Sequence, residues 1–198
     1  QFEGMKKKIP DFIKDDEPIR QPVAKLAKLL TNNPKKHLGL QPITKEDYEY
    51  WGLAAIATDE EAELACKMGV RIPKTFEQLK SLSGKSDEEL KKMLDHMSWT
   101  GLLEYNCENL DGKNPDHEKR WNLPVLIPGI GEFTNMNHTL LREHPEMGSF
   151  FDQMARTALG PISHMVPEGG GGIGMHVIPV EKAIDMENES ISVEHISY

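Results

Sequence analysis

The sequence predicts a mainly α-helical protein with a small β hairpin, built around a winged helix-turn-helix core with flanking N- and C-terminal helices. Three observations predict this fold. Capping boxes recur within residues 44–97, and each is typical of a helix start. Glycines followed by an apolar residue, Gly69 and Gly101, are typical of helix ends. After Gly101 the helical period gives way to strand-like runs, as the wing of such a domain requires.

Residues 1–43 are expected to form an extended arm and one short helix. The arm mixes basic and acidic residues and has no apolar period. Pro22 suits the first position of a helix whose apolar face includes Leu26 and Leu30. The polar run at residues 32–34 is expected to end this helix.

Residues 44–130 form the predicted winged-helix domain. A helix is expected to open at Thr44 and to run through Ile56. Three further helices begin at capping boxes, in which a hydroxyl accepts a hydrogen bond from the N–H three residues later and that later side chain reaches back to the cap. The three boxes are Thr58 with Glu61, Thr75 with Gln78, and Ser86 with Glu89.

The wing follows the last of these helices. Strand-like runs at residues 102–106 and 120–127 flank a polar loop that contains Asp-Gly and Asn-Pro turn dipeptides. Together they predict a two-stranded hairpin. Helix, helix, tight turn, helix and hairpin is the order of a winged helix-turn-helix.

Residues 131–160 are expected to form C-terminal helices that break at Pro145. Residues 161–198 are expected to hold a Gly-rich connector and the start of a further, truncated module. Gln1 cannot be an initiator residue, and the helical pattern at residues 190–198 stops in mid-course. We therefore expect the chain to be a piece of a longer protein.

Composition narrows the functional class. The 198 residues include 23 Lys and Arg against 32 Asp and Glu, so the net charge is -9, which disfavours nucleic acid as a partner. Neither a secretory signal nor a run of about 20 apolar residues is present. We expect a soluble cytoplasmic domain without a membrane partner. Two cysteines, Cys66 and Cys107, cannot make a disulfide framework or a four-thiolate metal site.

Motifs that could support catalysis are weak. Gly169, Gly171 and Gly174 satisfy G-x-G-x-x-G, but a helix precedes them and a strand-like segment at residues 176–180 follows, the reverse of a dinucleotide site. Cys66 is expected to be a small core residue. The remaining candidate ligands are too few or wrongly spaced for a metal, namely Cys107 with His117, and His138 with His144.

The start of the third capped helix argues against DNA binding. In a winged helix that reads DNA, this N-terminal half enters the major groove, and here it begins with Asp87, Glu88 and Glu89. Carboxylates repel phosphates and mostly accept hydrogen bonds. Nearby cations are balanced by acidic residues: Lys91 and Lys92 by Asp95, and Lys113, Lys119 and Arg120 of the wing by Asp111, Asp116 and Glu118.

Three segments point to a known family. Residues 58–65 match T-x-E-E-A-E-L-A, residues 90–102 follow L-x-x-M and G-L with looser spacing, and residues 176–180 match R-V-I-P-V except that His176 replaces the Arg. With these segments, residues 58–183 resemble the N-terminal region of multi-module iron–sulfur, flavin and pyridine-nucleotide oxidoreductases of anaerobic bacteria.

The resemblance implies a non-catalytic N-terminal accessory or docking domain within such an oxidoreductase. The parent protein would transfer electrons through FAD, NAD(P) and 4Fe-4S clusters, and none of the family's ligands for them maps onto this chain. We therefore assign no catalytic, cofactor-binding or metal-binding residue. The implied partners are downstream redox modules or a partner subunit, and a homodimer stays open.

Two alternatives remain. The first is a winged-helix transcriptional regulator that binds DNA as a dimer, which would need a contiguous basic face. The second is a small-molecule sensor that uses Trp51, Trp99 and Trp121. These tryptophans are otherwise expected in the core or at its edge.

We predict that the purified chain is colourless, because it has two cysteines and no glycine motif in a nucleotide-binding context. The measurement is a visible absorbance spectrum of the protein as isolated. A stoichiometric flavin or cluster band would overturn the assignment as an accessory domain.

Overall fold

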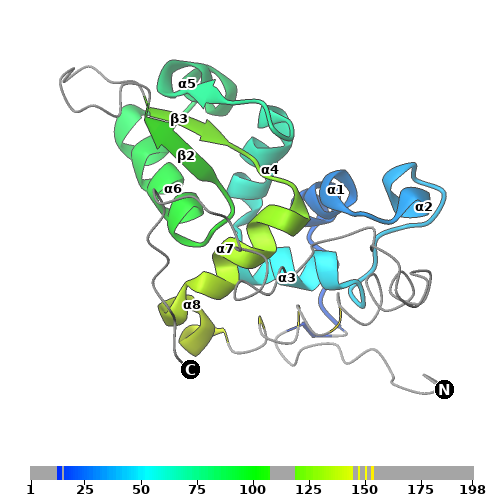
Figure 1. The fold of residues 1–198 in the computed structure, drawn as a ribbon. Helices are drawn as coiled ribbons and strands as arrows, with labels where there is room; N and C mark the ends of the chain where they lie inside the picture. Colours follow the sequence, from blue (N-terminus) through cyan, green and yellow to red (C-terminus); the bar gives the residue numbers. More distant parts are fainter. Residues whose placement is uncertain are drawn as a thin grey trace, which may run out of the picture. The chain divides into compact units, whose positions relative to one another are not determined.

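The computed structural model describes residues 13–14, 16–107 and 119–144, together with Met147, Phe150 and Gln153. It confirms a mainly helical protein with a small antiparallel sheet (Figure 1). The chain divides into residues 1–156 and 157–198, and every described residue belongs to the first unit. No helix among the described residues is long and apolar enough to cross a membrane.

Helices precede, separate and follow three short strands. The helices are α1 (Gln21–Leu30), α2 (Pro34–His37), α3 (Tyr48–Ile56), α4 (Asp59–Met68), α5 (Phe76–Ser83), α6 (Asp87–Trp99), α7 (Gly131–Met136) and α8 (His138–Glu143), and the strands are β1 (Lys74–Thr75), β2 (Glu104–Cys107) and β3 (Lys119–Asn122).

The three predicted capping boxes are confirmed, and α4, α5 and α6 each begin directly after one. In the box of α4, the Thr58 N–H donates to Glu61 Oε2 at 2.8 Å, and the Glu61 N–H donates to Thr58 Oγ1 at 3.2 Å. The boxes of α5 and α6 repeat this exchange. Two orphan N–H groups at each helix start are thereby satisfied from within the same four residues.

Other helix boundaries differ from the prediction. The helix predicted to open at Thr44 begins at Tyr48, because Asp47 Oδ2 accepts from the Thr44 N–H and so holds residues 44–47 in a turn. Pro22 is the second residue of α1, not the first. Asn33 does not merely end α1, since its side chain accepts from the Lys35 N–H and caps α2.

The C-terminal helices have a break that the sequence analysis did not predict. Asn137 separates α7 from α8, and α8 ends at Glu143, shortly before the predicted break at Pro145. The backbone of Asn137 is extended, and its side-chain oxygen accepts from the Leu140 N–H at 3.0 Å, which caps the new helix. Pro145 and the predicted segment 161–198 lie outside the described residues.

The sheet has three antiparallel strands in the order β1-β3-β2, one more than the predicted hairpin. Trp121 on the central strand pairs with both Lys74 and Tyr105. The predicted strand over residues 120–127 is wrong beyond Asn122. Pro124 cannot donate to a ladder, and the chain turns sharply at Leu126–Ile130 before α7.

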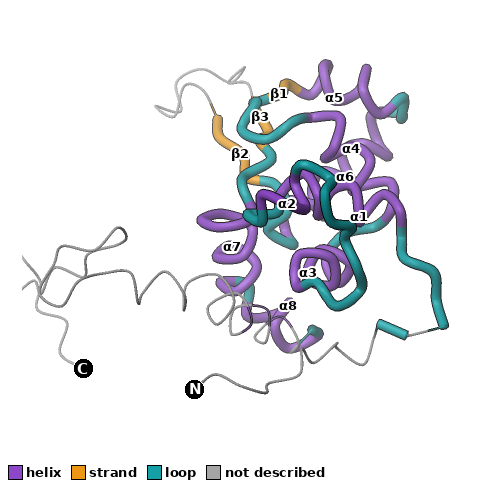
Figure 2. The backbone as a smooth tube through the Cα atoms, turned by 90° about the vertical axis from the view of Figure 1, so that its right-hand side faces the viewer, coloured by secondary structure: helices purple, strands orange, loops and turns teal. Residues whose placement is uncertain are grey.

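Most core side chains come from the helices. α1 packs against α4 and α3, and Figure 2 shows it between them. The Arg20 guanidinium joins all three, because it donates to the Ala54 and Ala57 carbonyls at the end of α3 and to Asp59 at the start of α4. The fully buried side chains include Leu26, Trp51, Leu53, Leu79, Leu90, Leu94 and Met97.

Gly101 sits just after α6 with φ of +83°, as its predicted role at a helix end requires. The Leu103 N–H donates to the Met97 carbonyl across this turn at 3.0 Å. A Cβ at Gly101 would lie 2.8 Å from the Thr134 nitrogen and 2.9 Å from Phe133 Cβ. The glycine therefore allows both the left-handed turn into β2 and the close approach of α7.

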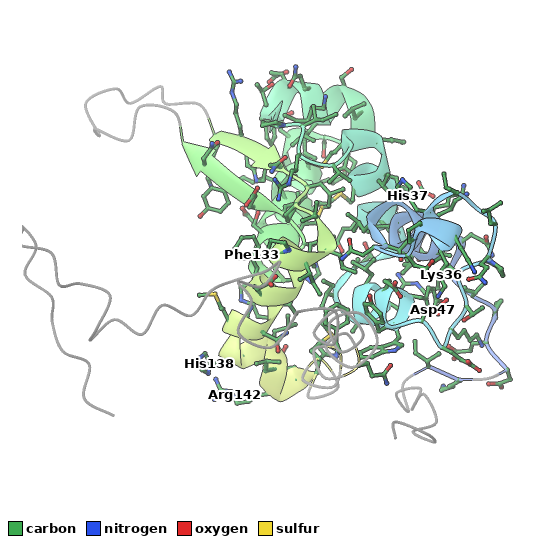
Figure 3. All side chains as sticks on the ribbon, turned by 45° about the vertical axis from the view of Figure 1, so that its right-hand side comes forward. Lys36, His37, Asp47, Phe133, His138 and Arg142 are labelled. Atoms are coloured by element: carbon green, nitrogen blue, oxygen red, sulfur yellow. The ribbon has the colours of Figure 1, made fainter. Side chains whose placement is uncertain are left out.

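A second structural link is the ion pair between Lys36 on α2 and Asp47 before α3, labelled in Figure 3. The Asp47 side chain is 3% exposed and that of Lys36 is 13% exposed. Burial alone would raise the pKa of Asp47, but hydrogen bonds from Lys36 and Thr44 and the charge of Lys36 outweigh it and lower the pKa below its usual value. The pair ties the segment after α1 to the start of α3.

We predict that Gly101→Ala lowers the free energy of unfolding by about 3 kcal/mol, from left-handed strain plus the clash with α7. Gly84 is the matched control, because it has φ of +67° and nothing lies within 4 Å of the methyl group that alanine would add. Gly84→Ala should cost only about 1 kcal/mol. The measurement is urea unfolding, and equal losses would contradict the close approach of α7.

We predict that Asp47→Asn costs about 3 kcal/mol near pH 7, because Lys36 loses its buried partner. The folded state lowers the pKa of Asp47, so the carboxylate stabilises the fold above its unfolded pKa. That stability is lost as the pH falls below about 4. The difference between wild type and variant should shrink there in urea unfolding. The exposed control Asp95→Asn should change stability by less than about 0.5 kcal/mol at either pH.

Candidate functional site

Several residues weighed from the sequence lie outside the described part. These are the glycines at 169, 171 and 174, the segment 176–180, and His117. Cys107 ends β2, but only its backbone is described.

Cys66 lies on α4, half-buried and packed against the core. Burial raises the pKa of its thiol, the charge of Lys25 lowers it to a smaller extent, and Glu63 raises it. A thiol that stays protonated at neutral pH is a weak nucleophile and a weak metal ligand. Cys66 therefore fits a packing role.

The three tryptophans lie on different elements. Trp51 on α3 is fully buried and meets Phe150 edge-on at 5.9 Å between ring centroids. Trp121 on β3 is buried and lies 6.2 Å from the Phe76 ring. Trp99, at the end of α6, is 46% exposed. The first two serve the core, and only Trp99 is open to a partner.

The paired histidines do not converge. His138 is the first residue of α8 and is exposed, and His144 follows its last residue. Within the described ranges, no group of three or more His, Cys, Asp or Glu side chains could hold a metal ion.

The acidic start of α6 is held by local interactions. Asp87 Oδ1 lies 2.5 Å from the Lys80 ammonium. Glu89 accepts from the Ser86 N–H and hydroxyl, and these hydrogen bonds lower the pKa of Glu89. Lys85 pairs with Glu60 of α4 at 2.7 Å. Carboxylates therefore meet the lysines that flank this end of the helix.

A hollow of about 430 Å³, which the sequence did not reveal, lies beside the sheet. We call it the sheet hollow. Glu104 and Asn122 face it from paired positions on β2 and β3, on the opposite face from Tyr105 and Trp121. The remaining lining residues come from the turn after α4 and from the segment that leads into α7: Arg71, Pro124, Pro128, Gly129, Glu132 and Phe133.

Hydrogen bonds fix the polar groups around the sheet hollow. The Asn122 side-chain amide donates to Glu104 Oε1. Glu132 Oε2 accepts from the Gly129 N–H at 2.6 Å. Arg71 has φ of +57°, unusual for a residue with a side chain, and its N–H donates to the Leu123 carbonyl at 2.8 Å. The site thus combines one cation and two carboxylates on restrained backbone.

Three large apolar side chains, Trp99, Phe133 and Met136, are exposed around the place where the end of α6 meets α7. Phe133 and Met136 are one turn apart on α7 and are 39% and 73% exposed. Asn137 joins the end of α7 to the end of α6, since its amide donates to the Trp99 carbonyl at 2.7 Å. Figure 3 shows Phe133 in α7 and His138 and Arg142 farther along in α8. We call this set the α7 apolar patch.

Side chains alternate between the two faces of a strand, and this alternation could have assigned Glu104 and Asn122 to one face of the sheet. No pattern in the neighbouring sequence identifies Arg71 or Glu132 as lining residues. They reach that face of the sheet only through the packing of the whole fold. Comparison with known proteins adds no constraint, since no family model, curated protein or solved structure matches this chain.

Proposed function

We propose that residues 44–130 form a winged helix that serves as a non-catalytic docking domain for protein partners. The element order α4-β1-α5-α6-β2-β3 and the sheet order β1-β3-β2 support the winged-helix assignment. In this arrangement α6 occupies the position of a recognition helix.

The charge at the start of α6 is the observation on which a docking function depends. A helix that reads DNA there needs cations and hydrogen-bond donors. Here Lys80 and Lys85 are paired with Asp87 and Glu60. Duplex phosphates would have to displace these carboxylates and would also meet Glu88, which is exposed.

The α7 apolar patch supports a protein partner. Exposed aromatic and Met side chains are enriched in protein interfaces, and Trp99 and Met136 would lose water-exposed apolar surface on docking. Phe133 is anchored by the close approach of α7 to Gly101, so little ordering is needed before a partner binds.

The resemblance to anaerobic oxidoreductases gives this docking function a context. We propose an N-terminal accessory domain in the cytoplasm, whose partners are the downstream redox modules or a second subunit. The described residues do not fit an iron–sulfur cluster, because Cys66 is half-buried with a raised pKa and no ligand group surrounds it. FAD, NAD(P) and 4Fe-4S clusters would accordingly be held by other parts of the parent protein.

A DNA-binding transcriptional regulator is the second candidate. The element order favours it as much as it favours docking, because both functions occur on one fold. Surface charge and binding measurements decide between them.

We predict no duplex DNA binding tighter than about 10⁻⁵ M near physiological salt. The measurement is fluorescence anisotropy with mixed-sequence duplexes and the gene's own upstream region, titrated with salt. If Lys6, Lys7 and Lys8 cause weak binding, deleting them should abolish it equally for every sequence. Submicromolar, sequence-dependent binding would make the regulator the better assignment.

We predict closely spaced cysteines within about a hundred codons after that of Tyr198, as a module that holds iron–sulfur clusters requires. Sequencing the gene beyond this codon checks the redox context. A downstream sequence without such cysteines would contradict the redox context. The docking proposal would then depend on the DNA-binding measurement.

A further inference from the structure

We propose that the sheet hollow binds a small ligand of the basic amino-acid class, with a guanidinium or ammonium group at one end and a carboxylate at the other. This site shares Phe133 with the α7 apolar patch but adds charged groups that the patch lacks. The proposal rests on the unused carboxylate oxygens, the charge balance and the rigid walls of the hollow.

The two carboxylates of the sheet hollow have hydrogen-bonding capacity that the described residues do not use. Glu104 and Glu132 each use one oxygen for an internal hydrogen bond, and a carboxylate has a second oxygen with two further lone pairs. A guanidinium, with five N–H donors, would satisfy several of these acceptors together.

Charge adds a second requirement. Arg71 is the single cation among the residues that line the hollow, and it shares the lining with the carboxylates of Glu104 and Glu132. Within the described part of the chain, Arg71 forms no ion pair with either of them. One positive charge against two negative charges leaves a site that favours a cationic ligand. Because Arg71 is exposed and forked, it suits a carboxylate on the same ligand.

The walls suit the alkyl part of such a ligand. Pro124, Pro128 and Phe133 provide apolar surface between the charged groups. Proline rings and an aromatic side chain have little rotational freedom to lose, which reduces the entropic cost of binding. The Phe133 ring can also attract a cation placed over its face. A volume of about 430 Å³ lies within the range of small-molecule pockets.

The ligand could be a free amino acid or the C-terminal basic residue of a partner chain, since both present a cation and a carboxylate. Isothermal titration of the full chain with L-arginine is the first test. We expect saturable binding with Kd of about 10⁻³ M or tighter. Citrulline lacks the cation and agmatine lacks the carboxylate, so each should bind at least about tenfold more weakly. A peptide that ends in arginine should match or exceed free arginine if a partner chain is the source.

Variants test the residues. Glu132→Gln and Arg71→Asn should each weaken arginine binding at least about tenfold, and Asn tolerates the left-handed backbone at position 71. Glu77→Gln, which removes an exposed carboxylate on α5, is the matched control and should leave binding unchanged. Urea unfolding verifies that each variant is folded.

If the titration gives no saturable heat up to about 10 mM arginine, which is well above the expected Kd, the proposal is wrong. It is also overturned if citrulline binds as well as arginine, or if the control variant weakens binding as much as Glu132→Gln. Because wild-type protein and ligand analogues give this answer alone, a variant that fails to fold does not obscure it. The DNA-binding measurement is unaffected by either result.

Discussion

Helix α7 and the turn after α6 lie so close together at Gly101 that no side chain fits between them. Gly101 turns the chain from α6 into β2, and the same missing side chain lets the α7 backbone lie against that turn. Thr134 is fully buried at this contact, and its hydroxyl lies 2.7 Å from the Ile130 carbonyl and 3.2 Å from the Thr100 carbonyl. The contact sets Glu132 and Phe133 beside the outer face of the strands. Both the sheet hollow and the α7 apolar patch follow from it.

Two surfaces of the described structure differ in the side chains that they expose. One is the start of α6, which a DNA-binding winged helix would place in the major groove, and the other is the sheet together with α7. At the start of α6, Glu89 completes the capping box, Asp87 pairs with Lys80, and Glu60 of α4 pairs with Lys85. Asp87 and Glu89 also favour the N-terminus of α6 through the helix dipole. At the other end of α6, Trp99 is exposed beside α7. Charged groups and apolar side chains therefore remain accessible at the sheet and on α7.

Local chemistry was the predictable part of the fold. Capping boxes and the glycine at position 101 depend on a few neighbouring residues, so the sequence predicts the helices that they bound. The sequence does not predict strand β1, because this strand has only two residues and is defined by its pairing with the distant strand β3. The turn after Asn122 depends on Pro124 and on packing that brings α7 back to Gly101. Arg71 and Glu132 meet at the sheet hollow through these same long-range contacts, which leave no periodic signal in the sequence.

We propose that ligands and partners bind at the sheet and α7, and not at the start of α6. Amide chemical-shift mapping of ¹⁵N-labelled protein, with L-arginine and with duplex DNA added separately, tests it most directly. The account predicts that arginine shifts the amides of residues 71, 104, 122 and 129–133, while DNA leaves residues 86–95 unmoved at physiological salt. Shifts that concentrate along residues 86–95 on adding DNA, with the sheet hollow silent to arginine, would contradict the account.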